Sequence, residues 1–132
     1  MKKTQRTHSI PRKLSSLILV ALDDLEKAEK DPKFKVDMGL YFRPSENGCL
    51  VCFAGSVMAF GLGANPKRPY CTGDFPRYTE RLRALDKIRM GSFHDEQRGE
   101  YARFDVTSYY TDPERWKMEM VLTAFALKEI GL

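Results

Sequence analysis

One segment near the N-terminus fixes the first element of the fold, because its apolar residues recur at the spacing of a helix. The intervals between them are mostly three and four residues, which gathers them on one helical face. They are Leu14, Leu17, Ile18, Ala21, Leu22, Leu25 and Ala28. Ser9 is suited to cap the N-terminus and Pro11 to the first turn, while Pro32 ends the helix because it pushes the preceding residue out of the α region. The sequence therefore predicts an amphipathic helix over residues 11–30.

The next part of the chain has the pattern of a strand followed by a tight turn. Apolar and polar residues alternate over residues 34–42, as they do in a half-buried strand. The dipeptide Asn47-Gly48 is suited to a turn with positive φ. After that turn, residues 49–54 are apolar throughout. They fit either a second strand that pairs back or the beginning of a helix that continues to Phe60, and this alternative stays open.

Two further helices are predicted in the second half of the chain. A short one covers residues 79–90, and a last one runs to Gly131 from Thr111-Asp112-Pro113-Glu114, which fits a capping box with an early proline. Between them, a loop or short helix leads into a short strand at residues 103–109. These elements predict a small single α+β domain of three to four helices with a short antiparallel sheet of two or three strands.

Length and composition agree with one compact domain. The chain has 132 residues, of which 42% are hydrophobic, enough for one core without structural disulfides or an obligatory metal. No apolar run reaches the roughly 20 residues that a membrane-spanning helix needs, and the most apolar segment, residues 49–62, is interrupted by glycines. We therefore expect no membrane span. No cofactor is expected either, because the glycines near residue 61 lack the lysine of a phosphate-binding loop.

Positive charge is concentrated at the N-terminus. The net charge is +4, from 22 Lys and Arg against 18 Asp and Glu, and five of these bases lie in the first thirteen residues with no acid among them. Such a segment either adds nonspecific affinity for nucleic acid or is simply solvated. We expect a basic N-terminal arm over residues 1–10 and a single domain over residues 11–132. The acidic pairs at residues 23–24 and 95–96 are expected on solvated faces.

Three cysteines and one histidine could supply metal ligands. Cys49, Cys52, Cys71 and His94 form the ligand set of a Cys3His zinc site. The bulky apolar residues around the first two thiols favour another interpretation, in which they are small buried hydrophobic side chains. An odd number of cysteines and the lack of a recognisable signal peptide favour a reducing compartment, so a cytoplasmic location is expected.

The same residues could instead support nucleophilic catalysis. A cysteine nucleophile needs a base to form the thiolate, and Cys49 or Cys52 with His94 would supply the pair. Residues 48–66 resemble the segment of papain-like hydrolases in which a cysteine opens an apolar helix that ends in a glycine-containing turn. This resemblance implies a small cysteine-dependent hydrolase. The chain departs from that family in lacking its Asp-Cys-Ser-Gly pattern.

A second basic region, over residues 67–89, interleaves cations with aromatic rings. Cations of this kind can contact phosphates, and the rings can stack on bases. The candidate contact residues are Arg81, Arg83, Lys87, Arg89, Tyr70 and Tyr78. In the competing interpretation, the charges face water while the aromatic rings brace a proline-rich loop.

A further resemblance concerns the segment CLVCFAGSVMA at residues 49–59, together with LDKIR at residues 85–89 and Gly91. This pattern is similar to one in small uncharacterised proteins that bacteriophages and prophages encode. The resemblance implies an accessory role in the host cytoplasm, including interference with a host enzyme or a defence system. We therefore predict a non-enzymatic protein that binds a host protein or nucleic acid. A homodimer is compatible with the sequence, and the cysteine hydrolase and a zinc-stabilised nucleic-acid-binding module are the alternatives.

Overall fold

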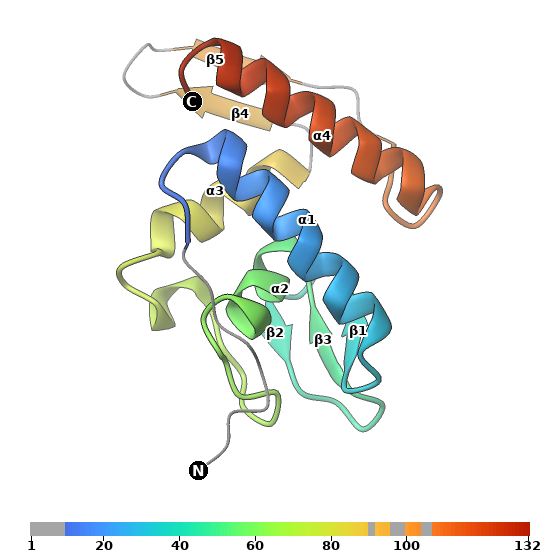
Figure 1. Ribbon diagram of the computed structural model, residues 1–132. Helices are drawn as coiled ribbons and strands as arrows, with labels where there is room; N and C mark the ends of the chain where they lie inside the picture. The colour runs from blue at the N-terminus through green and yellow to red at the C-terminus, as the bar shows by residue number, and fades with distance from the viewer. Residues whose placement is uncertain (1–9, 90–91, 96–99, 104–106) are drawn as a thin grey trace.

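A computed structural model describes residues 10–89, 92–95, 100–103 and 107–132, with the backbone alone for the second and third of these ranges. Helix α1 (Leu14–Lys30) lies between helix α4 (Pro113–Glu129) and helix α2 (Phe53–Phe60), as Figure 1 shows. A small three-stranded sheet lies beyond α2, and helix α3 (Thr79–Arg89) packs beside it. Residues 1–9, almost all of the expected basic arm, lie outside the described residues.

Helix α1 has the apolar face that the sequence predicts but begins later than expected. It starts at Leu14, with Lys13 as N-cap and no side-chain cap, because the first backbone bond of the ladder runs from Leu17 to Lys13. The expected cap, Ser9, lies outside the described residues. The helix ends at Lys30, before Pro32, as predicted.

One residue of α1 is not where the sequence places it. Asp24 is fully buried, whereas Asp23 beside it is exposed. The expectation of a solvated face is therefore wrong for Asp24. The Lys27 ammonium lies 3.7 Å from its carboxylate and 3.2 Å from that of Asp23.

The central strand of the sheet is β3 (Cys49–Val51). It pairs in parallel with β1 (Phe34–Val36) on one side and antiparallel with β2 (Phe42–Arg43) on the other. The predicted strand over residues 34–42 is therefore two strands. Asp37 separates them, because its carbonyl accepts from Leu40 N–H and its carboxylate accepts from Gly39 N–H. This turn sends the two halves to opposite edges of β3.

The apolar segment after the turn contains both elements that the sequence left open. Strand β3 ends at Val51, Cys52 is the N-cap of α2, and the helix continues to Phe60. All eight residues of α2 are buried. The helix lies close to the chain before β2, since a β-carbon on Gly55 would lie 1.7 Å from the Tyr41 carbonyl oxygen. Only glycine fits this contact.

The later helices are confirmed with corrected ends. Helix α3 buries Leu82, Leu85 and Ile88, the face that the sequence predicts. Helix α4 is capped by Asp112, whose carboxylate accepts from Arg115 N–H at 3.1 Å, so the predicted capping box from Thr111 is wrong by one residue. Pro113 occupies its first turn, as expected.

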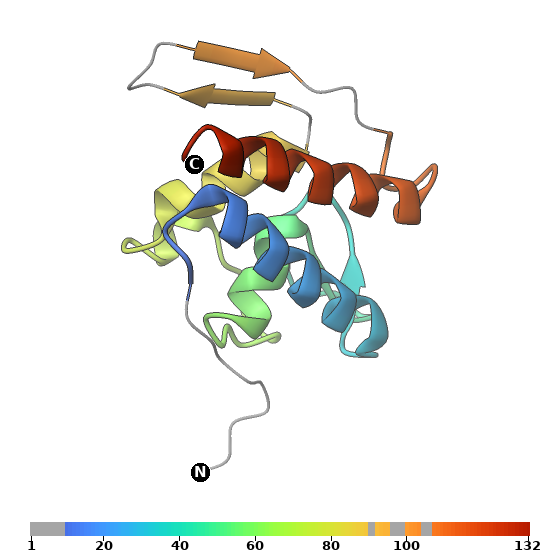
Figure 2. The ribbon, with the colours of Figure 1, turned by 45° about the horizontal axis from the view of Figure 1, so that its top comes forward.

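Between α3 and α4 lies an antiparallel pair of strands, β4 (Ser92–Asp95) and β5 (Glu100–Arg103). The sequence predicted one strand at residues 103–109 instead. Arg103 is the last residue of β5, residues 104–106 lie outside the described residues, and the prediction is wrong for residues 107–109, which form no strand. Figure 2 shows this pair beside α4.

The α+β class is confirmed, with four α-helices and the three-stranded sheet in the described residues. One of the two pairings in that sheet is parallel, where the sequence suggested antiparallel pairing. None of the helices in the described part of the chain has the length and apolar character of a membrane span.

Candidate functional site

The three cysteines occupy different environments. Cys49 in β3 and Cys52 at the start of α2 are 2% and 1% exposed, whereas Cys71 is exposed, and all three thiols are free. Burial raises the pKa of Cys49 and of Cys52 to about 11. A catalytic cysteine needs the opposite shift, towards a thiolate at neutral pH. The buried position of Cys52 instead serves the fold, since its sulfur accepts from Gly55 N–H at 3.4 Å.

The other residue of the proposed catalytic and zinc sites is His94. It lies in β4, where the description covers the backbone and not the side chain. Among the described side chains, no group of three or more His, Cys, Asp or Glu residues could hold a metal ion. The described thiols thus give no geometric support to a zinc site.

The predicted basic surface is divided by the fold. Arg81 is turned towards the domain, where its guanidinium donates to the Ile10 carbonyl at 2.8 Å and lies 4.8 Å from the centre of the Tyr78 ring. Arg89 lies at the far end of α3 and pairs with Asp86 at 2.9 Å. Arg81 therefore links α3 to the segment before α1, whereas the Arg89 ion pair lies within α3. The two arginines do not form one basic surface.

The remaining predicted contact residues also separate. Tyr70 is half-buried against Phe42 and Phe75, with ring centres at 5.1 and 5.4 Å, so it braces the loop, as the competing interpretation expected. Arg83 and Lys87 are exposed one turn apart on the outer side of α3. Of the six candidates, only this pair forms an exposed basic face.

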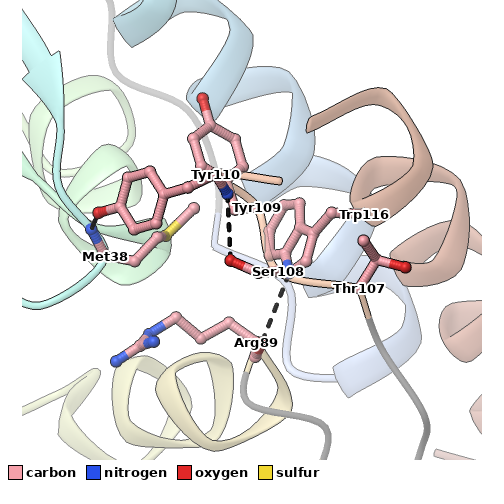
Figure 3. A pocket seen from close by; sticks show the side chains of 7 residues that line it. All are labelled: Met38, Arg89, Thr107, Ser108, Tyr109, Tyr110 and Trp116. Atoms are coloured by element: carbon pink, nitrogen blue, oxygen red, sulfur yellow. Dashed lines mark hydrogen bonds between the residues drawn. The ribbon is translucent and has the colours of Figure 1, made fainter. Parts of the chain in front are cut away.

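A pocket of about 340 Å³ lies elsewhere, where four parts of the chain meet (Figure 3). Met38 comes from the turn between β1 and β2, and Arg89 ends α3. Residues 107–110 form one wall, and Trp116 comes from the first turn of α4. The lining residues are Met38, Arg89, Thr107, Ser108, Tyr109, Tyr110 and Trp116.

Hydrogen bonds fix the walls of this pocket. Met38 N–H donates to the Tyr110 hydroxyl at 2.6 Å, and the Trp116 indole N–H donates to the Arg89 carbonyl at 3.4 Å. The Tyr110 side chain reaches across to Met38 in Figure 3 and is 62% exposed. The Trp116 ring meets Phe53 edge to face, with centres 5.1 Å apart, which connects the pocket to the core.

Glu29 of helix α1 holds the wall formed by residues 107–110 in place. The Tyr109 hydroxyl donates to a Glu29 carboxylate, and burial together with this bond raises the pKa of Tyr109. The Lys117 ammonium lies 2.6 Å from the other Glu29 oxygen. Burial alone would lower the pKa of Lys117, but the hydrogen bond and charge of Glu29 raise it. The pocket is therefore preorganised by an ion pair between α1 and α4.

A second unpredicted feature is the outer face of α4. Met118, Leu122 and Phe125 are 64%, 59% and 55% exposed, although they are large and apolar. We call these three residues the α4 stripe. A signal for them was present in the sequence, because their spacing of four and three residues repeats the pattern of the buried face. The pocket had no such signal, since its walls come from distant parts of the chain.

Comparison of the chain with protein families, with curated proteins and with solved structures found no match.

Proposed function

We propose that this protein is a non-enzymatic binding domain that contacts a host protein through the pocket of Figure 3. The observation that carries the proposal is the composition of the lining. Five of the seven lining residues are Tyr, Trp, Met or Arg, the types that are enriched where proteins bind one another. Trp, Tyr and Arg are also the commonest residues at energetic hot spots.

The shape of the pocket favours an anchor side chain of the partner. A volume of about 340 Å³ is at the lower end for small-molecule sites and is ample for one large side chain. The rings of Tyr109, Tyr110 and Trp116 would surround an apolar or aromatic anchor. Hydroxyl groups of Thr107 and Ser108 would hydrogen-bond to the partner's backbone beside it.

The wider role is also part of the proposal. The resemblance of residues 49–59 to proteins of phages and prophages supports an accessory function in the host cytoplasm, such as inhibition of a host enzyme or a defence system. Three free cysteines agree with a reducing compartment. The raised pKa values of Cys49 and Cys52 favour binding over the hydrolase alternative.

Affinity capture tests the proposal. The tagged protein is incubated with a bacterial lysate treated with nuclease, and bound proteins are read by mass spectrometry. We expect one stoichiometric protein that is lost with Tyr110→Ala, which removes an exposed pocket wall, and with Ser108→Trp, which fills the pocket. The control Glu46→Lys, in the turn between β2 and β3, should retain it. Equal capture by all four proteins would contradict the role of the pocket.

Nucleic-acid binding is the second candidate, since Arg83 and Lys87 are exposed on one side of α3. It predicts material that nuclease removes and an affinity that falls steeply with salt. The double substitution Arg83→Ala with Lys87→Ala should weaken such binding and reduce its salt dependence. An affinity that does not change with salt would reject this candidate while leaving the protein-binding proposal standing.

A further inference from the structure

We propose that a second copy of this chain covers the α4 stripe, in a two-fold symmetric dimer built on an antiparallel pair of α4 helices. This interface is separate from the pocket. Trp116, which lines the pocket, belongs to the buried face of α4 with Met120 and Leu127. At about 100° per residue, the stripe lies on the opposite side of the helix from that face.

The fold itself does not use the stripe. Helix α4 packs on α1 (Figures 1 and 2), and its Trp116 ring also reaches Phe53 of α2, so both contacts use the buried face and not the stripe. Truncating a side chain that is more than half exposed in the monomer would cost little folding energy. A contiguous row of such side chains on one helix instead marks an association surface.

The spacing of the stripe fits helix-to-helix packing. Two exposed charged residues, Arg115 and Glu129, continue it by three residues at one end and four at the other. The complete series of five therefore alternates intervals of three and four residues, which is the heptad spacing of paired helices. It reads Arg115, Met118, Leu122, Phe125 and Glu129.

Charge selects the orientation of the pair and identifies the occupant as a second copy. Arg115 lies seven residues before Leu122, and Glu129 lies seven residues after it. In an antiparallel pair that crosses at Leu122, Arg115 of each helix meets Glu129 of the other, at both ends of the contact. A parallel pair would instead bring like charges together. The stripe is thus complementary to itself in one arrangement.

The same arrangement satisfies the apolar residues. Met118 is four residues before Leu122 and Phe125 is three after it, so each Met118 packs beside the Phe125 of the other copy. The contact from residue 115 to residue 129 extends about 21 Å along the helix. Helices that cross at about 20° can maintain such a contact over this length. The interface is isologous, so every contact occurs twice.

Sedimentation equilibrium over a range of concentrations tests the dimer. The unaltered protein should dimerise, and Leu122→Lys should weaken the dimer about 100-fold because the change enters the interface twice. Glu46→Lys, which changes an exposed charge far from α4, should leave the dissociation constant unchanged. Circular dichroism verifies that each variant is folded. A protein that stays monomeric at every concentration, or a dimer that Leu122→Lys leaves intact, would overturn the proposal.

Charge reversal tests the orientation. Arg115→Glu alone leaves two acidic residues at the ends of the stripe, and Glu129→Arg alone leaves two basic ones, so each should weaken its own dimer about 10-fold. An equimolar mixture of the two variants should form a heterodimer, and a chain with both changes should dimerise as the unaltered protein does. If the mixture gains nothing over the separate variants, the antiparallel arrangement is wrong.

Discussion

Helices α2 and α4 are both rich in apolar residues, but the chain uses them differently. Every residue of α2 is buried, enclosed by α1, α3 and the sheet. Helix α4 packs mainly on α1 and carries apolar residues on two opposite faces, one buried and one more than half exposed. Folding explains all the apolar residues of α2 but not the exposed apolar residues of α4.

The difference separates two reasons for an apolar side chain. In α2, each apolar residue removes surface from water within the domain, so its loss should be measurable as lost stability. In the α4 stripe, the same residue types contribute little to the fold of the monomer. Their effect should appear in association instead. Paired substitutions in the two helices can therefore confirm or break this distinction.

The largest effect is expected at Gly55 in α2. In Gly55→Ala, the new methyl group would lie 1.7 Å from the Tyr41 carbonyl oxygen, and neither backbone can withdraw easily. We expect a loss of about 3 kcal/mol or more in the free energy of unfolding, measured by urea denaturation.

Gly73→Ala is the matched control for this substitution. A methyl group there would meet only the Cys71 sulfur at 3.7 Å, an ordinary contact distance, and its unfolding midpoint should stay close to that of the unaltered protein. Similar losses in the free energy of unfolding for the two substitutions would show that α2 does not lie in close contact with the Tyr41 carbonyl.

A pair of methionines compares the helices directly. Met58 in α2 is fully buried, whereas Met118 in the stripe is 64% exposed. Met58→Ala should lower the free energy of unfolding by about 3 kcal/mol, because it leaves a cavity in the core. Met118→Ala should change it by less than about 0.5 kcal/mol when measured on the monomer. Equal losses in denaturant titrations would remove the distinction between the two helices.

The thiol at the start of α2 predicts a dependence of stability on pH. Burial raises the pKa of Cys52 to about 11 from an ordinary value of 9.0, so the folded chain keeps its proton after the unfolded chain has lost it. The Cys52 thiol therefore does not change the free energy of unfolding below pH 9. Between pH 9 and 11 it lowers this free energy by up to about 1.4 kcal/mol per pH unit.

Between pH 9 and 11, the free energy of unfolding should fall less steeply with pH in Cys52→Ala than in the unaltered protein. Cys71→Ala is the control, because that thiol is exposed. Identical slopes for all three proteins would mean that Cys52 is not protected from ionisation.

The smallest predicted effect concerns the start of α4. Asp112→Ala removes the carboxylate that accepts from Arg115 N–H and should cost about 1 kcal/mol in thermal or chemical unfolding. Thr111→Ala should cost less, since its side chain does not cap the helix. A larger loss for Thr111→Ala than for Asp112→Ala would support the capping box from Thr111 that the sequence predicts.

The sequence was sufficient to predict the buried residues of helices that pack against the core through one face. The buried residues of α1 and α3 follow from their spacing alone, because one face of each meets the core. It was insufficient where one residue overrides a pattern. Alternation over residues 34–42 is that of a strand, but the turn at Asp37 divides it.

The candidate sites were harder to predict because they depend on tertiary packing. The sequence suggests that Arg81 and Arg89 share one surface. In the structure, Arg81 donates to the Ile10 carbonyl and Arg89 pairs with Asp86. The pocket joins Met38 to residues 107–116, which no local pattern connects. The helical spacing of the α4 stripe, by four and three residues, is visible in the sequence. Its exposure became clear only once α1 was seen to cover the other face.

Disulfide trapping tests the central claim most directly, because it reports where two copies touch. In a Cys71→Ser background, Leu122→Cys places one exposed thiol at the proposed crossing point, whereas Glu129→Cys places it about 10 Å along the helix from that point. Two thiols at the crossing point can reach disulfide distance. We predict rapid oxidation to a covalent dimer for Leu122→Cys and slow oxidation for Glu129→Cys. Slow oxidation of Leu122→Cys, or faster oxidation of Glu129→Cys, would contradict the antiparallel dimer.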